Sequence, residues 1–77
     1  MREIDLSQMK SGEQGIISAI KSGYGLTERT ESLGIRIGIK IKKISSQLMH
    51  GPVTIQVGNT QVAIGFGMTK KIFVKVE

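Results

Sequence analysis

The 77-residue chain contains no cysteine and no tryptophan, and it has a single histidine. Without cysteine, it cannot form a disulfide, a thiolate metal site or a cysteine nucleophile. The absence is compatible with a reducing compartment, so we expect a cytoplasmic protein. The histidine, His50, stands at a turn in "LMHGP", and the sequence shows no partner that would orient it for catalysis. We therefore expect His50 to be solvated and the chain to bind no metal.

Long hydrophobic runs are also absent. No stretch approaches the roughly 20 apolar residues that a membrane helix requires, and the N-terminal "MREIDLSQMKSG" lacks the apolar core of a signal peptide. Export and membrane spanning are therefore disfavoured.

Aromatic residues are scarce, with only Tyr24, Phe66 and Phe73 in the chain. This disfavours a barrel that stacks nucleic-acid bases and a groove that holds proline-rich peptides, because both need several aromatic walls. The segments "GYGLTE" and "GFGMTK" lack the third glycine of a phosphate-binding loop. We expect no nucleotide hydrolysis, no cofactor, no catalytic residue and hence no enzymatic activity.

Charge is distributed unevenly along the chain. Residues 1–31 hold four basic and five acidic residues, whereas residues 32–76 hold seven basic residues and no acid. Such a segment can be a docking surface for an acidic partner. It can equally be a set of solvated lysines that protect exposed strands from aggregation.

Hydrophobic periodicity predicts a mainly β chain with one short helix. The helix spans residues 27–33, where Thr27 is a plausible N-cap and Gly34 is placed to end it. The first strand alternates imperfectly, which indicates burial on both faces or a β-bulge. The five predicted strands cover residues 14–20, 39–44, 53–57, 60–64 and 72–76.

The best-defined feature is a hairpin in "GPVTIQVGNTQVAIG". A two-residue turn at Gly58 and Asn59 pairs Val57 with Thr60, and continues outward to Ile55 with Val62 and Val53 with Ile64. This register places apolar residues opposite each other on one face.

The most patterned stretch, "LGIRIGIKIKKI", changes its period. Gly34 and Gly38 interrupt the chain, and from Ile39 apolar residues alternate with lysine as in a half-buried strand. Ile44 falls out of phase, which indicates a bulge near Lys43. This alternation predicts that Lys40 and Lys42 face outward.

Five short strands and one helix in this length suggest a small closed or nearly closed barrel, because closure removes exposed edges. The pattern alone favours neither an SH3-like barrel nor an OB barrel.

Five segments together resemble the FeoA family of small ferrous iron uptake proteins. They are "LSQMKSG" at residues 6–12, "GIISAI", "RTESLGIRIGIKIKKI", "GPVTIQVGNTQVAI" and "IFVKVE". Each motif is weak alone, but their order and spacing are specific. The sequence departs from the family pattern at Thr30, Ile37 and Gly65.

The resemblance implies a single FeoA-like domain over residues 1–77, with a five-stranded SH3-like barrel and one short helix inserted after the first strand. It also implies a partner, FeoB, which is the membrane ferrous iron transporter with a cytosolic GTP-binding domain. Two alternatives are a free-standing barrel that binds nucleic acid, and a metal-linked regulatory module like the C-terminal domain of iron-dependent repressors.

We expect partner binding to use basic residues of the acid-free region, with an apolar surface around Leu33 and Ile35 as the alternative. The turns are expected at Gly34, Gly38, Gly51, Gly58 and Asn59. The basic candidates are Lys40, Lys42 and Lys43, followed by Lys70, Lys71 and Lys75.

Overall fold

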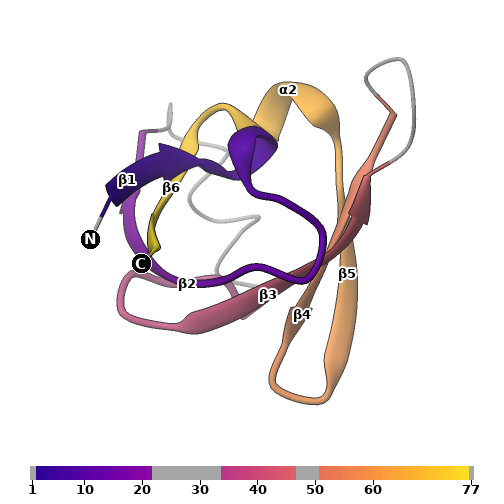
Figure 1. The fold of residues 1–77 in the computed structure, drawn as a ribbon, viewed down its shortest axis with the longest axis horizontal. Coiled ribbons are helices and arrows are strands. Elements are labelled where there is room, and N and C mark those ends of the chain that lie inside the picture. The colour runs from indigo at the N-terminus through magenta and orange to yellow at the C-terminus, as the bar shows by residue number, and fades with distance from the viewer. Residues whose placement is uncertain (1, 22–33, 47–50, 77) are drawn as a thin grey trace.

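One antiparallel sheet dominates the computed structural model, which describes residues 2–21, 34–46 and 51–76. In these ranges six strands lie in the order β1-β6-β2-β3-β4-β5. The sheet curls around a shared interior, and pairing of β1 with β6 brings the two ends of the chain together (Figure 1). The strands are β1 Arg2–Asp5, β2 Gln14–Ile20, β3 Lys40–Ser46, β4 Val53–Val57, β5 Thr60–Ile64 and β6 Ile72–Val76.

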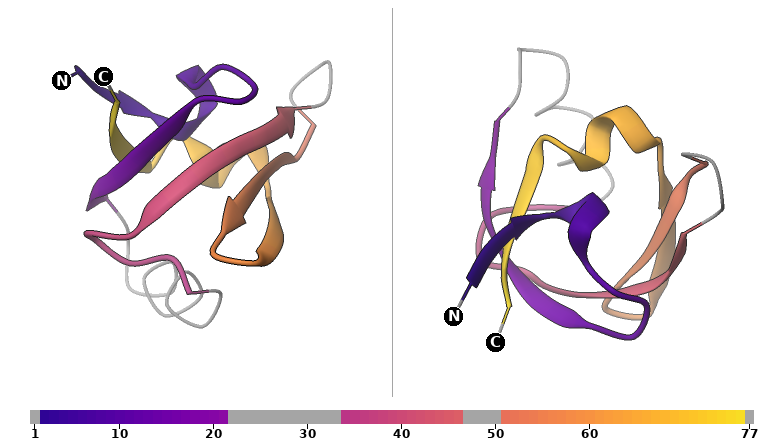
Figure 2. Two further views of the ribbon diagram at one scale, coloured as in Figure 1. Left: turned by 60° about the horizontal axis from the view of Figure 1, so that its bottom comes forward. Right: turned by 45° about the horizontal axis from the view of Figure 1, so that its top comes forward.

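Two short helical turns contact each other beside the sheet: the 3₁₀ helix η1, Leu6–Gln8, and α2, Phe66–Thr69. The views in Figure 2 show α2 connecting β5 to β6. Asp5 caps η1, because its carboxylate accepts a 2.9 Å hydrogen bond from the Ser7 amide and its own amide donates to the Gln8 side chain. None of the described helices is long and apolar enough to cross a membrane.

The core is aliphatic and follows the alternation of the strands. In β6, for example, Ile72, Val74 and Val76 are buried, whereas Lys75 is exposed. The core side chains are Leu6, Met9, Ile17, Ile35, Ile41, Val53, Ile55, Val62, Ile64, Ile72, Val74 and Val76.

The predicted fold class, a mainly β SH3-like barrel, is confirmed, and the strands that the structure describes form an open rather than a fully closed barrel. The predicted bounds of β2 and β6 are those observed. The hairpin register is also confirmed, with Val57 opposite Thr60 and Ile55 opposite Val62.

Both predicted irregularities are present as register shifts. In β2 the shift lies between Ile17 and Ala19, where the strand pairs with β6. In β3 it lies between Lys43 and Ser45, where the strand pairs with β4. These shifts explain why neither sequence segment alternates cleanly.

Three described elements were not predicted: the strand β1 and the helical turns η1 and α2. With β1, the described sheet has six strands rather than five. The three sequences, "REID", "LSQ" and "FGMT", are too short to show a period. β1 is defined by its pairing with β6, which begins at Arg2 opposite Val76. The predicted helix at 27–33 lies outside the described residues.

Three of the predicted turn glycines have a positive φ: Gly34 at 84°, Gly38 at 93° and Gly58 at 60°. A side chain would be strained at these positions. Gly51 lies just before β4.

Gly15 is required for a different reason, the close approach of β2 to β6. A Cβ atom at this position would lie 2.9 Å from Val76 Cγ1 and 3.0 Å from the Lys75 carbonyl oxygen. The carbonyl is held in the sheet and valine is stiff at χ1, so neither neighbour yields easily.

We expect Gly15→Ala to lower the free energy of unfolding by about 1–3 kcal/mol, because the added methyl overpacks the β2–β6 junction. Chemical denaturation measures this change. Gly67→Ala in α2 is the control, because its Cβ would contact no described residue within 4 Å, and alanine favours a helix. A Gly15→Ala protein as stable as the parent would show that the strands can separate without cost.

Candidate functional site

A row of side chains crosses the outer face of three neighbouring strands. Ile16 of β2 lies opposite Lys40 of β3 on one side and Lys75 of β6 on the other. Both lysines are exposed, and the Ile16 residue is 43% exposed to solvent. The row therefore presents an apolar side chain between two cations.

A second row runs beside the first and is polar throughout. Gln14 of β2 lies opposite Lys42 of β3, and Lys42 lies opposite Gln56 of β4. The two rows are linked along β2 and β3, where alternate residues face the same side.

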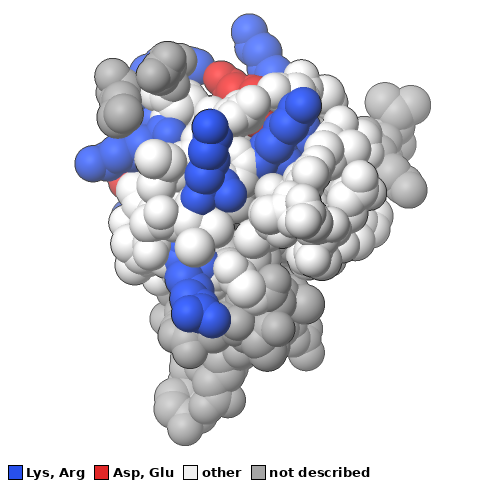
Figure 3. All heavy atoms as spheres, turned by 90° about the horizontal axis from the view of Figure 1, so that it is seen from below, with Lys and Arg blue, Asp and Glu red and all other residues white. Residues whose placement is uncertain are grey.

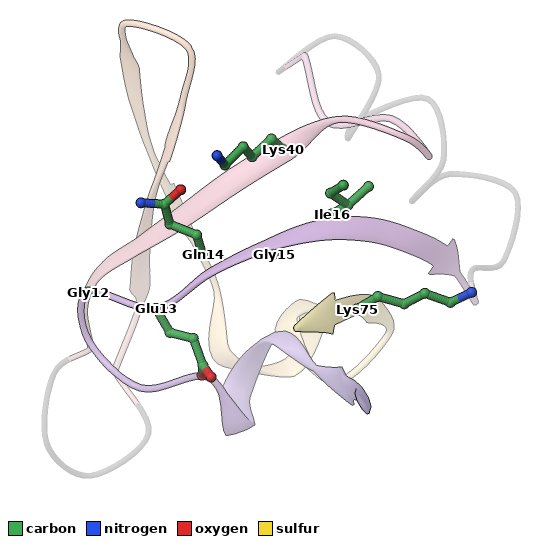
Figure 4. A pocket seen from close by; sticks show the side chains of 7 residues that line it. All are labelled: Gly12, Glu13, Gln14, Gly15, Ile16, Lys40 and Lys75. Atoms are coloured by element: carbon green, nitrogen blue, oxygen red, sulfur yellow. The ribbon is translucent and has the colours of Figure 1, made fainter. Parts of the chain in front are cut away.

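Two adjoining hollows, of about 520 and 370 Å³, lie over these rows and share Gln14 and Lys40. In Figure 4 the Lys40 side chain extends along β3 toward Gln14, whereas Glu13 points to the opposite side of β2 from Gln14 and Lys75 extends away from the other labelled side chains. We call this surface the β2–β3 groove. Its lining residues are Gly12, Glu13, Gln14, Gly15, Ile16, Lys40, Ile41, Lys42, Gln56, Gly58 and Lys75.

The groove offers binding groups rather than an acid–base pair. Its carboxylate, Glu13, is already engaged, because it forms a 3.2 Å ion pair with Arg2 and accepts a 3.0 Å hydrogen bond from the Lys10 amide. Elsewhere in the described part of the chain, no three His, Cys, Asp or Glu residues are grouped as metal ligands would be. Lysines, amides and one exposed isoleucine suit an acidic, partly apolar partner surface.

The space-filling view from below shows how positive charge is spread on this side of the molecule (Figure 3). Lysine and arginine side chains stand apart, separated by neutral surface, with little acidic surface between them. Spaced lysines of this kind act individually and are screened by salt.

A second exposed isoleucine lies close to β2 along the backbone. Ile37 is 66% exposed, and the following residue, Gly38, donates a 2.8 Å hydrogen bond to the Ile17 carbonyl. Since Ile16 precedes Ile17, both exposed isoleucines belong to segments that are joined by this bond. Ile37 is one of the positions that depart from the family pattern.

The structure separates the six predicted docking lysines into three groups. Lys40, Lys42 and Lys75 line the groove. Lys70 and Lys71 are exposed between α2 and β6 and do not line it. Lys43 is buried.

The expectation that Lys43 is a surface cation is therefore wrong, since its side chain is only 2% exposed. The same holds for Ile35, whose side chain is fully buried in the core. Ile39, Ile41 and Lys43 are spaced by two, so strict alternation already placed Lys43 on the inner face. Leu33 lies outside the described residues, as do Met49 and His50.

The buried Lys43 ammonium is held by backbone carbonyls of the N-terminal turn. Its Nζ donates to the Met9 carbonyl at 2.6 Å and to the Leu6 and Ser7 carbonyls at 3.4 Å. Burial lowers the pKa of Lys43 below its usual value, and the carboxylates of Asp5 and Glu13 oppose this shift. Lys43 is thus a structural cation that ties residues 6–9 to β3.

Known proteins of similar sequence belong to ferrous iron transport. The model of the FeoA domain family matches residues 4–76. The chain is 41% identical over 70 residues to a protein of Methanocaldococcus jannaschii provisionally named Fe(2+) transport protein A, and the match covers 91% of this chain and 83% of that relative.

Solved structures show the same fold. The crystal structure of an iron uptake regulatory protein, FeoA, matches with a TM-score of 0.87 at 31% identity, over 97% of each chain. A manganese-dependent transcriptional repressor matches with a TM-score of 0.88 over 97% of this chain and 42% of its own. At 14% identity, that second likeness concerns the fold alone.

We expect Lys43→Met to lower the free energy of unfolding by about 1–3 kcal/mol, because methionine fills the space of the stem but leaves the Met9 carbonyl without this donor. The matched control is Lys42→Met, an exposed neighbour whose loss should change stability by less than about 0.5 kcal/mol. Denaturant titration compares the two. A Lys43→Met protein of equal or greater stability would show that dehydration of the ammonium outweighs its hydrogen bonds.

The lowered pKa of Lys43 predicts a pH dependence with a definite sign. At pH values between the lowered pKa of Lys43 in the folded state and its unfolded value of 10.5, Lys43 binds a proton more often in the unfolded chain than in the folded one. The contribution of Lys43 to stability therefore rises with pH in this window. The free energy of unfolding of the parent minus that of Lys43→Met should therefore rise between pH 7 and 10.5. A fall in this difference as the pH rises would contradict a lowered pKa of Lys43.

Proposed function

Because the chain belongs to the FeoA family, we propose that it is a cytoplasmic, non-catalytic accessory protein of ferrous iron uptake that docks on the transporter FeoB. The whole of residues 1–77 would act as one FeoA-like unit. The family relationship supports the link to iron transport, and the resemblance of the sequence motifs to this family supports FeoB as the partner.

The observation that carries the docking proposal is the β2–β3 groove. It combines the exposed apolar side chain of Ile16 with three exposed lysines, Lys40, Lys42 and Lys75. Apolar contact at the centre of such a surface supplies affinity, and charges at its rim mainly set the association rate. An acidic surface of FeoB with an apolar centre would fit this arrangement.

The lining of the groove supports a binding role rather than a catalytic one. Its lysines are not paired with a base or nucleophile among the residues that line it, and Glu13 is engaged by Arg2 and the Lys10 amide. General acid–base chemistry needs titratable groups that reach a common substrate atom. Binding is the function that these side chains support best.

We expect the triple change Lys40→Gln, Lys42→Gln and Lys75→Gln to weaken binding to the cytosolic GTP-binding region of FeoB by roughly threefold to a hundredfold, since each exposed charge contributes about 0.2–1 kcal/mol. The loss should be larger at low salt than at high salt. Calorimetry or surface plasmon resonance at two salt concentrations measures it.

Ile16→Ser tests the apolar part of the same surface, and its effect should vary little with salt. The double change Lys70→Gln with Lys71→Gln is the control. Like the triple change, it removes lysine charges, but these two lysines lie outside the groove. Docking through the groove would be refuted by FeoB binding that survives both groove variants. If the parent instead binds DNA or RNA with a steep salt dependence that the triple change abolishes, the protein is a nucleic-acid-binding barrel.

A further inference from the structure

We propose that a second basic surface, the α2–β6 corner, binds the anionic headgroups of a membrane surface. We define the corner by Lys21, Lys70 and Lys71 together with Phe66 and Phe73. It uses residues outside the β2–β3 groove, so the proposal is independent of FeoB docking.

A backbone contact assembles the corner from segments far apart in the sequence. The Lys21 amide, at the end of β2, donates a 2.7 Å hydrogen bond to the Lys71 carbonyl in the turn before β6. This bond brings Lys21 beside the consecutive lysines Lys70 and Lys71. All three side chains are exposed, so three cations gather at one end of the molecule.

Two of these lysines lie over aromatic rings. Lys21 Nζ is 4.9 Å from the ring centroid of Phe73, and Lys70 Nζ is 5.0 Å from that of Phe66. Contacts of this kind hold the aliphatic stems against apolar surface while the ammonium groups stay in water. The corner thus combines fixed positive charge with half-buried Phe66 and Met68 of α2.

Within the described part of the chain, ion pairing does not cancel the charge of the corner. Across the described ranges, no carboxylate forms a salt bridge with Lys21, Lys70 or Lys71. Asp5 lies opposite Phe73 in the β1–β6 pair, but its carboxylate accepts the Ser7 amide in the cap of η1. The three lysines therefore remain available to an external anion.

A lipid surface fits the corner better than nucleic acid does. Base stacking needs a free aromatic face, and lysine already covers one face of Phe66 and of Phe73. The corner lies at the end of the barrel where α2 projects, at the top of Figure 1, whereas β2 and β3 run along the base. A projecting end with charge and apolar side chains can rest on a flat anionic surface, where each lysine contributes about fivefold to the partition coefficient.

The test is co-sedimentation of the purified protein with vesicles of phosphatidylcholine alone or mixed with an equal amount of phosphatidylglycerol. We expect binding to the mixed vesicles only, and a roughly 25-fold lower partition coefficient for Lys70→Gln with Lys71→Gln. Lys70→Arg with Lys71→Arg should retain binding, because the charge is kept.

The matched control is Lys40→Gln with Lys42→Gln, which removes the same charge from the β2–β3 groove. Its effect should stay below about threefold, because charges more than a Debye length of roughly 8–10 Å from the membrane are screened. Equal losses for both double variants, or no binding of the parent to the mixed vesicles, would overturn the proposal. The proposal would also be overturned if Lys70→Gln with Lys71→Gln lowered the affinity for a single-stranded oligonucleotide but not the affinity for vesicles.

Discussion

The Lys43 ammonium is the contact on which the arrangement around the groove depends. Its side chain binds the carbonyls of Leu6, Ser7 and Met9, and its backbone exchanges hydrogen bonds with Gly12 and Glu13. One residue of β3 therefore holds the whole segment from η1 to the start of β2. Because Gly12 and Glu13 line the β2–β3 groove, the buried lysine also positions one wall of the proposed docking surface.

Lysines of the same strand have different physical roles, which alternation decides. Lys40 and Lys42 face solvent, where each charge contributes little to stability and can be used for association. Lys43 faces the interior, where an ammonium is tolerated only because carbonyl oxygens replace its water. The basic character of the chain thus divides into a structural cation and surface cations, and six of the latter lie in the groove or at the α2–β6 corner.

Much of the fold could be predicted from the sequence, because local patterns control it. The register of the Gly58–Asn59 hairpin, the bounds of β2 and β6, and both bulges follow from period-two alternation and its interruptions. The site could be predicted only in part. Lys40 and Lys42 were predicted in one set of lysines and Lys75 in another, whereas the exposure of Ile16 was missed, because an isoleucine in a strand is ordinarily assigned to the core.

By itself, the sequence determined the features that depend only on neighbouring residues. These are the alternating strands, the two-residue turn, and the turn glycines Gly34, Gly38 and Gly58, which adopt a positive φ. Tertiary structure alone decided which residues meet across the sheet. β1 exists because it pairs with β6 at the other end of the chain, and Ile16 lies between two lysines because β2 has β3 on one side and β6 on the other. The burial of Lys43 likewise requires the carbonyls of residues 6–9 to close over it. Periodicity predicts on which face of the sheet a side chain lies. The residue that lies next to it on that face depends on the order of the strands, which no local pattern encodes.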